Sequence, residues 1–491
     1  MLRPWKITLG ERINPDRPTP IYLQIVHAVI HEIERGRLLS GTFLPSSRDL
    51  AQLLSVNRKT VVLAYEDLIA QGWLTSRGTR GTMVATLHGD DKPALPAVAR
   101  RQAEAERDLP AYRFQPPPER PLAWSADGGI KLDEGSPDGR LFPVDVLSRA
   151  YRTAIKRAAR TGCLSYRDPR GTSHLRETIA EMLKAERGLT VTPEHICITR
   201  GSQHGIFLAT QLLIATGDTV LVEKLTYEPA ITAFAARGAR IVPVGLDKQG
   251  VDVDDVEKAC RKHRVRAIFL TPHHQFPTTV ALRPERRLRL LELARQFDFA
   301  LIEDDYDHEF HFESQPLLPM ASYAPARVIY VGSLSKLLLP ALRIGYIAAP
   351  PPLIDAIAHQ VSLIDGMGNS FTEDAAAELI ESGELRRHAR KATQVYAERR
   401  THFATALGEL LGGRAEFRVP DGGLAFWLRF PEADTLDRIE RAAPALGLRF
   451  ANSRSFATSD RVDRGLRLGF ASLTPEEARN ALGLLARAAD A

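Results

Sequence analysis

From about residue 130 to the C-terminus, short apolar runs alternate with longer amphipathic stretches. The clearest apolar runs are 219–223, 267–271, 300–304, 328–332 and 343–349. Several are rich in β-branched residues, and the segments between them are long enough for helices, which is typical of βαβ units. The pattern predicts an α/β fold with a mostly parallel sheet and helices on both faces.

The first 85 residues show helical periodicity followed by a short β-like tail. Predicted helices begin at 20, 45 and 57 and end near Gly36, Leu54 and Gly72. Their apolar faces are Ile21, Ile25, Val29, Ile30 and Ile33 in the first helix, and Leu50, Leu53 and Leu54 in the second. A tight turn at Ser55–Val56 separates the second helix from the third, which Asn57 is suited to cap. We therefore expect a helix-turn-helix, with residues 73–85 forming a wing.

Basic side chains occur where such a unit meets DNA. The first turn of the third helix carries Arg58, Lys59 and Thr60, and the wing tip carries Arg77 and Arg80. Arginine can bind guanine through two hydrogen bonds, whereas lysine suits phosphate. Residues 1–85 hold 11 Lys+Arg against 7 Asp+Glu, so four of the five net positive charges lie there. This favours double-stranded DNA as a partner, although a solvated basic face or a three-helix protein-interaction module stays open.

Composition sets the domain boundaries and the cellular context. Residues 86–125 hold seven prolines and the run RRQAEAERD, which is typical of a linker. We therefore predict a DNA-binding domain over 1–85, a linker over 86–125 and a second domain over 126–491. Three widely spaced cysteines (Cys163, Cys197 and Cys260) indicate reduced thiols. With no stretch of about 18 apolar residues, we expect a soluble, cytoplasmic protein without membrane contact.

The segment VIYVGSLSKLLLPALRIGY contains a lysine in a position suited to chemistry. Lys336 follows Ser333 and Ser335 and precedes Arg343, between two apolar runs. A lysine that forms a Schiff base with pyridoxal 5'-phosphate needs a lowered pKa and a fixed position beside groups that hold the phosphate. Two hydroxyls and a guanidinium supply such groups here.

Acidic residues end the run ALIEDDYDHEF. Pyridoxal phosphate requires a carboxylate at its ring nitrogen, and Asp304 is the candidate, with Tyr306 placed to bind the ring hydroxyl. A rival interpretation is a metal site, with ligands from Glu303, Asp304, Asp305, Asp307, His308 and His311. The segment matches no established ligand spacing, so we predict no metal.

Two other strand ends carry weaker signals. In TRGSQHG a strand is followed by a glycine turn and a helix, so the amides of Gly201, Ser202 and Gln203 are candidates to bind phosphate. Tyr227, after the next strand, is a candidate to stack on the pyridine ring, although a core or surface tyrosine fits equally well.

Together these segments resemble two known families. PIYLQI, LPSSRDLAQLL, NRKTVVLAYEDLIAQGWL and RGTRGTMV resemble the GntR-type winged helix. The rest of the chain resembles fold-type I aminotransferases, and the combination is similar to the MocR subfamily of GntR regulators. The motifs that carry this likeness are EGSPDGRLFP, LSYRDPRGTSHLRETIA, ITRGSQHG, LTPHHQFPTT, LIEDDYDHEF, YVGSLSKLLLPALRIGY and LRLGFA. The resemblance implies a homodimer and a smaller α+β C-terminal subdomain.

The resemblance also implies roles for single residues at the cofactor. Lys336 resembles the lysine of the internal aldimine, Asp304 the partner of the ring nitrogen and Tyr306 that of the ring hydroxyl. Arg343 and Ser333 resemble phosphate ligands.

Four further residues match family positions. Tyr166 resembles the tyrosine that reaches the neighbouring subunit's phosphate, and Arg48 a contact to the DNA backbone. Arg467 resembles the arginine that binds the carboxylate of a substrate or effector. Where these enzymes have Asn-Pro-Thr-Gly, this chain reads HHQFPTT, so Gln275 is the candidate for the asparagine's hydrogen bond.

The implied function is a DNA-binding transcription regulator that senses a small amine or amino acid, or pyridoxal phosphate itself, through the aldimine at Lys336. A working aminotransferase with a DNA-binding appendage shares every cofactor residue and remains the alternative. A regulator that has lost its cofactor is disfavoured, because Lys336, Asp304, Tyr306 and Arg343 are all present.

Overall fold

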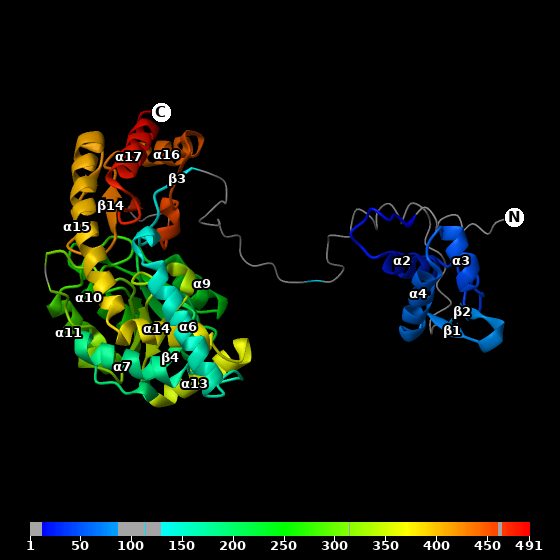
Figure 1. Ribbon diagram of the computed structural model, residues 1–491. Coiled ribbons are helices and arrows are strands. Elements are labelled where there is room, and N and C mark those ends of the chain that lie inside the picture. Colours follow the sequence, from blue (N-terminus) through cyan, green and yellow to red (C-terminus); the bar gives the residue numbers. More distant parts are fainter. Residues whose placement is uncertain (1–11, 87–112, 114–128, 314, 460–463) are drawn as a thin grey trace. The chain divides into compact units, whose positions relative to one another are not determined.

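A computed structural model describes residues 12–86, 113, 129–313, 315–459 and 464–491 (Figure 1). The chain divides into two compact units, 1–120 and 121–491. The predicted linker over 86–125 lies almost entirely outside the described residues. No helix in the described part of the chain is long and apolar enough to cross a membrane.

The described part of the small unit includes a hairpin and the helices α2 (Ile21–Glu34), α3 (Ser47–Leu54) and α4 (Arg58–Ala70). Each of the last two has a side-chain cap, because Ser46 accepts a hydrogen bond from the Asp49 amide and Asn57 accepts one from the Lys59 amide. Ser55 takes the left-handed conformation that closes the turn between them. The predicted helix-turn-helix is confirmed.

Packing in this unit differs from the prediction at one position. Ile25, Val29 and Leu50 are fully buried, whereas Leu53 is 41% exposed. Leu50 and Leu54 lie one turn apart and face the core together, and Leu53 is rotated away from them. The prediction that Leu53 belongs to the apolar face is therefore wrong.

The predicted wing is an antiparallel pair of strands. β1 (Leu74–Ser76) pairs with β2 (Thr82–Val84) in the register Leu74↔Val84. A short 3-10 turn, Gly78–Arg80, connects them and carries Arg80, with Arg77 just before it.

A seven-stranded sheet forms the centre of the large unit, in the order β4-β12-β11-β10-β9-β5-β6. The strands are β4 (Ile196–Thr199), β5 (Thr219–Glu223), β6 (Arg240–Val244), β9 (Val265–Leu270), β10 (Ala300–Asp305), β11 (Val328–Ser333) and β12 (Gly345–Ala348). β12 runs antiparallel to both of its neighbours, and the other pairs are parallel. All five predicted strands are present, but β12 begins at Gly345 rather than Arg343.

Helices cover both faces of this sheet, as predicted. One face packs on α8 (Ser202–Leu213), α9 (Glu228–Ala236) and α13 (Pro351–Asp365), and the other on α7 (Ser173–Arg187), α10 (Val253–Lys262), α11 (Pro284–Phe297) and α14 (Ser370–Glu381). Neighbouring strand residues point to opposite faces. Ile302 therefore packs on the face covered by α8, α9 and α13, and Leu301 packs on the other face. The remaining helices before the C-terminal part are α6 (Val144–Arg160) and the short α12 (Met320–Tyr323).

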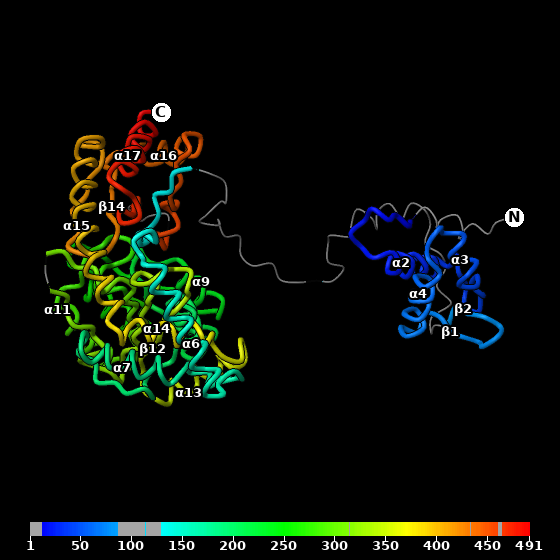
Figure 2. The backbone as a smooth tube through the Cα atoms, in the orientation of Figure 1, coloured from blue at the N-terminus to red at the C-terminus, as the bar shows by residue number. Residues whose placement is uncertain are grey.

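The predicted α+β C-terminal part packs at one end of the large unit (Figure 2). It contains the antiparallel sheet β13 (Glu416–Phe417), β14 (Ala425–Arg429) and β16 (Gly465–Gly469), with α15 (Glu384–Leu411), α16 (Ala433–Ala442) and α17 (Pro475–Asp490). The start of the unit returns to it, because β3 (Ile130–Lys131) pairs with β15 (Leu448–Arg449). A two-stranded pair, β7 (Leu246–Asp247) and β8 (Gly250–Val251), completes the fold.

Candidate functional site

The site forms at the carboxyl ends of the parallel strands, the usual ligand position in an open α/β sheet. Lys336 follows β11, and its Nζ donates a hydrogen bond to the Gly135 carbonyl at 2.5 Å. Burial lowers the pKa of Lys336, partly opposed by the nearby Asp133 carboxylate. A lowered pKa increases the share of neutral amine, which is the nucleophilic form.

Asp304, at the end of β10, is buried, and its Oδ1 has no hydrogen-bond partner among the described residues. Burial raises the pKa of Asp304 to about 8, and the neighbouring Asp305 and Asp307 carboxylates add to the effect. A buried carboxyl oxygen of this kind is stabilised by a positively charged donor.

Arg467, on β16, is 2% exposed and faces the same space. Its Nε donates to the Glu134 carbonyl and its Nη1 to the Pro277 carbonyl, both at 2.8 Å. Its Nη2 lies 3.2 Å from the Tyr306 hydroxyl, which itself donates to the His274 carbonyl at 2.8 Å. Within the described ranges Arg467 forms no ion pair with a carboxylate, so its charge is available to an anionic ligand.

Aromatic rings form one wall of this space. The Arg467 guanidinium lies 4.7 Å from the centre of the Phe276 ring. Tyr227 meets the same ring edge-to-face at 5.3 Å. Tyr227 is therefore part of the site wall, beside Tyr306 and Phe276.

The candidate phosphate cradle lies at the N-terminus of α8. Gly201 precedes the helix with φ of 82°, and a Cβ there would lie 3.1 Å from Arg343 Nη2. Arg343, with φ of 53°, donates to the Arg200 carbonyl at 2.9 Å. Ser202 and Gln203 begin α8, so their amides are among those that a helix N-terminus offers to anions.

The two serines before Lys336 differ in their hydrogen bonding. Ser333 Oγ accepts from the Ser335 amide at 3.1 Å, whereas the buried Ser335 Oγ has no partner in the part of the chain that the structure describes. The Ser335 hydroxyl is therefore available to a ligand.

Two predicted residues have surroundings that the sequence did not indicate. Gln275 Nε2 donates to Glu223 Oε2 at 3.0 Å and to the Leu225 carbonyl at 2.7 Å, while its Oε1 accepts from Thr278. Both ends of this amide are thus engaged within the protein. Tyr166 is 89% exposed.

Sequence reasoning missed the backbone acceptors of the site. The carbonyls of Glu134 and Gly135 bind Arg467 and Lys336, and the carbonyl of His274 binds Tyr306. The only signal was the motif EGSPDGRLFP, which pointed to the segment without indicating what its backbone does.

In the small unit, the predicted DNA contacts lie at the N-terminal ends of α3 and α4 and on the wing. Arg48, Arg58, Lys59, Arg77 and Arg80 are exposed, and Thr60 is half-buried. Arg58 Nε donates to Ser47 Oγ at 3.3 Å, which links the recognition helix α4 to α3.

The donor set fits pyridoxal phosphate. Asp304 Oδ1 lacks the positively charged donor that a protonated ring nitrogen provides, and Lys336 has the lowered pKa that a Schiff-base lysine needs. Arg343, the Ser335 hydroxyl and the N-terminus of α8 are the groups that would hold its phosphate.

Comparison with known proteins assigns both units. The model for bacterial regulatory proteins of the gntR family matches residues 21–84, and the model for aminotransferase class I and II matches 127–485. The probable rhizopine catabolism regulatory protein MocR of Rhizobium meliloti is 31% identical over 96% of this chain and 94% of its own length. The pyridoxine biosynthesis regulator PdxR of Corynebacterium glutamicum is 30% identical over 94% of both chains. The chain belongs to the MocR-type GntR regulators.

This MocR-type protein is a DNA-binding transcription regulator, and its cofactor is pyridoxal 5'-phosphate. Its large unit is similar to a multiple substrate aminotransferase from Thermococcus profundus, with a TM-score of 0.69 and 29% identity over 74% of this chain and 92% of that one. The α-aminoadipate aminotransferase LysN of Thermus thermophilus gives 0.68 and 27% over 74% and 92% of the two chains.

Proposed function

We propose that this regulator senses an amino acid rather than a simple amine, and that the bound effector changes how residues 1–85 bind an operator. Arg467 binds the carboxylate of the effector, and the amino group of the effector meets the cofactor at Lys336. An effector acts in this way only if it binds two conformations of the protein unequally.

The observation that carries this proposal is the position of Arg467. A buried guanidinium held by two backbone carbonyls keeps its full charge, because carbonyls do not neutralise it. A planar carboxylate matches its donors and supplies the opposite charge. An amine without a carboxylate adds no negative charge at this guanidinium, which then has only the electrostatic attraction of Glu134 and Asp307.

Pyridoxal phosphate, when bound, supplies an aldehyde that combines with amines and a ring that withdraws electrons. We assign Asp304 to the ring nitrogen, Tyr306 to the ring hydroxyl and Tyr227 to the ring face. The phosphate ligands are proposed to be Ser333, Ser335, Arg343, the α8 amides and the partner chain's copy of Tyr166.

Changing Arg467 to glutamine tests the effector class. We expect an amino acid that binds the wild type to bind this variant about 30-fold or more weakly, because a buried charged hydrogen bond is lost. The decarboxylated amine should bind both proteins alike. The measurement is the change in the cofactor's visible spectrum on titration. Arg454→Gln, which changes an exposed arginine of the C-terminal part, is the control. Equal weakening of both ligands contradicts the proposal.

The alternative is an aminotransferase with a DNA-binding appendage, since the solved relatives of the large unit are aminotransferases. We propose that regulation, not turnover, is the function. Incubation with an amino acid and a 2-oxo acid separates the two, because an enzyme releases new amino acid far in excess of its own amount.

We also propose a homodimer. Tyr166 is 89% exposed and Leu164 is 63% exposed, and exposed apolar side chains also lie on α6, at Val144 and Ile155. Apolar surface of this kind favours a protein partner. A two-fold dimer carries two winged helices and therefore binds two half-sites.

In the small unit, neighbouring residues should have different effects. Arg58→Ala is expected to weaken operator binding by about 1–3 kcal/mol and to relax the preference at one base pair. Lys59→Ala should weaken binding to all sequences alike and reduce the salt dependence, because lysine contacts phosphate. Binding measured over several salt concentrations, on the operator and on single-base variants, separates the two. Loss of base preference in Lys59→Ala instead would reverse the assignment.

A further inference from the structure

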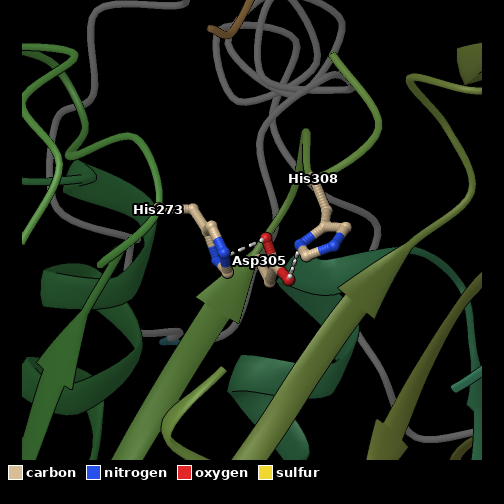
Figure 3. Close-up of side chains that lie close together, drawn as sticks. All are labelled: His273, Asp305 and His308. Atoms are coloured by element: carbon tan, nitrogen blue, oxygen red, sulfur yellow. Dashed lines mark ion pairs between the residues drawn. The ribbon is translucent and has the colours of Figure 1, made fainter. Parts of the chain in front are cut away.

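Two histidines and an aspartate, His273, His308 and Asp305, point toward one another (Figure 3). His273 follows β9, Asp305 ends β10, and His308 lies in the next turn. His273 Nδ1 is 3.4 Å from Asp305 Oδ1, and His308 Nδ1 is 3.0 Å from Asp305 Oδ2. One nitrogen or oxygen of each residue lies within 4.8 Å of the others, and all three side chains are buried.

This cluster is separate from the ring-nitrogen partner. Consecutive strand residues point to opposite faces, so Asp304 and Asp305 leave β10 on different sides. Asp305 points to the face of Tyr330, whose hydroxyl donates to Asp305 Oδ2 at 2.5 Å.

The hydrogen bond on the far side of the His273 ring fixes what this ring can do. His273 Nε2 bonds to the Leu317 carbonyl, which only accepts, so Nε2 carries the hydrogen. In the neutral ring the lone pair of Nδ1 then faces the carboxylate of Asp305. Two lone pairs that face each other repel, so this arrangement is stable only with a cation between them.

Four buried polar atoms in this place form no hydrogen bond of good geometry within the described residues, although His273 Nδ1 and His308 Nδ1 lie close to the Asp305 carboxylate. They are His273 Nδ1, Asp305 Oδ1, His308 Nδ1 and His311 Nε2. Buried polar atoms are normally satisfied, so a shared deficit at one point indicates a missing ligand. The His311 ring lies 6.1 Å from the His273 ring and 5.9 Å from the His308 ring, centre to centre.

We propose that His273, Asp305 and His308 bind a divalent first-row transition-metal ion, with zinc as the expected metal. Imidazole nitrogens and a carboxylate oxygen suit such ions, and three protein ligands leave one tetrahedral position for water or His311. The Leu317 carbonyl and the Tyr330 hydroxyl orient the ligands from outside, as is usual at metal sites.

The surrounding charge permits a cation. Arg187 Nε lies 3.9 Å from Asp305 Oδ2, but the same guanidinium pairs with Glu309. Asp307 adds a further negative charge and holds His274 at 2.7 Å. Arg287 adds a second positive charge that acts on His273 and Asp305. The carboxylates of Asp305, Asp307 and Glu309 still outnumber the two guanidiniums.

A cavity of about 870 Å³ provides a path for the ion, since His273, His274 and His311 line it. The ion also lies close to the effector site along the chain. It fixes His273, and the carbonyl of the next residue, His274, accepts the hydrogen bond of Tyr306. Metal binding thus stabilises the position of a proposed cofactor ligand.

The test uses full-length protein without a histidine tag, treated with a chelator and titrated with Zn²⁺ by calorimetry. We expect about one ion per chain, and at least about tenfold weaker binding in His308→Asn. His402→Asn, at an exposed position on α15, should bind as the wild type does. Lys336→Ala, which lacks covalent cofactor, should keep the stoichiometry, and this excludes the cofactor as the ligand.

A second measurement uses only the wild type, so it does not depend on whether the variants fold. Co²⁺ added to the wild type should give visible absorption bands of a four-coordinate site, and Zn²⁺ should raise the melting temperature of the wild type. Absence of stoichiometric binding overturns the proposal. Undiminished binding in a folded His308→Asn also overturns it, since the ion is then held elsewhere.

Discussion

Lys336→Ala is expected to leave the protein without covalently attached pyridoxal phosphate. Its amine has a lowered pKa through burial and hydrogen-bonds a backbone carbonyl at 2.5 Å, so it is both nucleophilic and fixed. Borohydride reduction followed by mass spectrometry of the intact chain should find one cofactor on the wild type and none on the variant.

The control is Lys248→Ala, an exposed lysine between β7 and β8. It should be labelled as fully as the wild type. If Lys336→Ala is still labelled at one site, another lysine holds the cofactor and the assignment of GSLSK is wrong. Loss of label with an unchanged far-ultraviolet circular dichroism spectrum confirms that the chain is folded without it.

The pattern of apolar and polar residues predicted the strands and helices well where the burial of side chains determines that pattern. The run 219–223 coincides with β5 at both ends, because its middle residues, 220–222, are apolar and buried on both faces of the sheet. Asn57 capped α4 as expected, since the cap is a contact two residues away in sequence. Leu53 was misplaced because periodicity alone does not say which side of a short helix meets the core.

Contacts between distant segments could not be derived from the pattern. Lys336 meets Gly135 and Arg467 meets Glu134 across 201 and 333 residues, and both acceptors are backbone carbonyls that any residue type would supply. The resemblance to a known family placed Lys336 and Arg467 in a common site, but it did not predict the hydrogen-bond acceptor of either side chain.

The histidine cluster also depends on a contact between distant segments that the sequence pattern does not predict. The segment 303–311 offers acids and histidines without a ligand spacing of its own. His273, from the loop after β9, completes the set because β9 and β10 are adjacent parallel strands. The order of the strands in the sheet decides which of them are neighbours, and the sequence pattern does not predict that order.

Asp304→Asn is expected to change stability and cofactor binding in opposite directions. Burial raises the pKa of Asp304 from 3.8 to about 8 in the protein without cofactor. Below about pH 4 the carboxyl is protonated in the folded and unfolded chains alike. Between about pH 4 and 8 only the unfolded chain loses the proton, so the stability of the folded state falls as pH rises.

At about 1.4 kcal/mol for each pKa unit, the loss reaches about 5 kcal/mol at pH 8. Asparagine does not ionise, so the cofactor-free variant should gain stability over the wild type as pH rises from 5 to 8. Urea unfolding at both pH values measures this gain, with the exposed Asp145→Asn as control. With cofactor the order should reverse, because a protonated ring nitrogen compensates Asp304 and asparagine offers it no charge. A stability difference independent of pH would show that Asp304 is already ionised and paired in the cofactor-free protein.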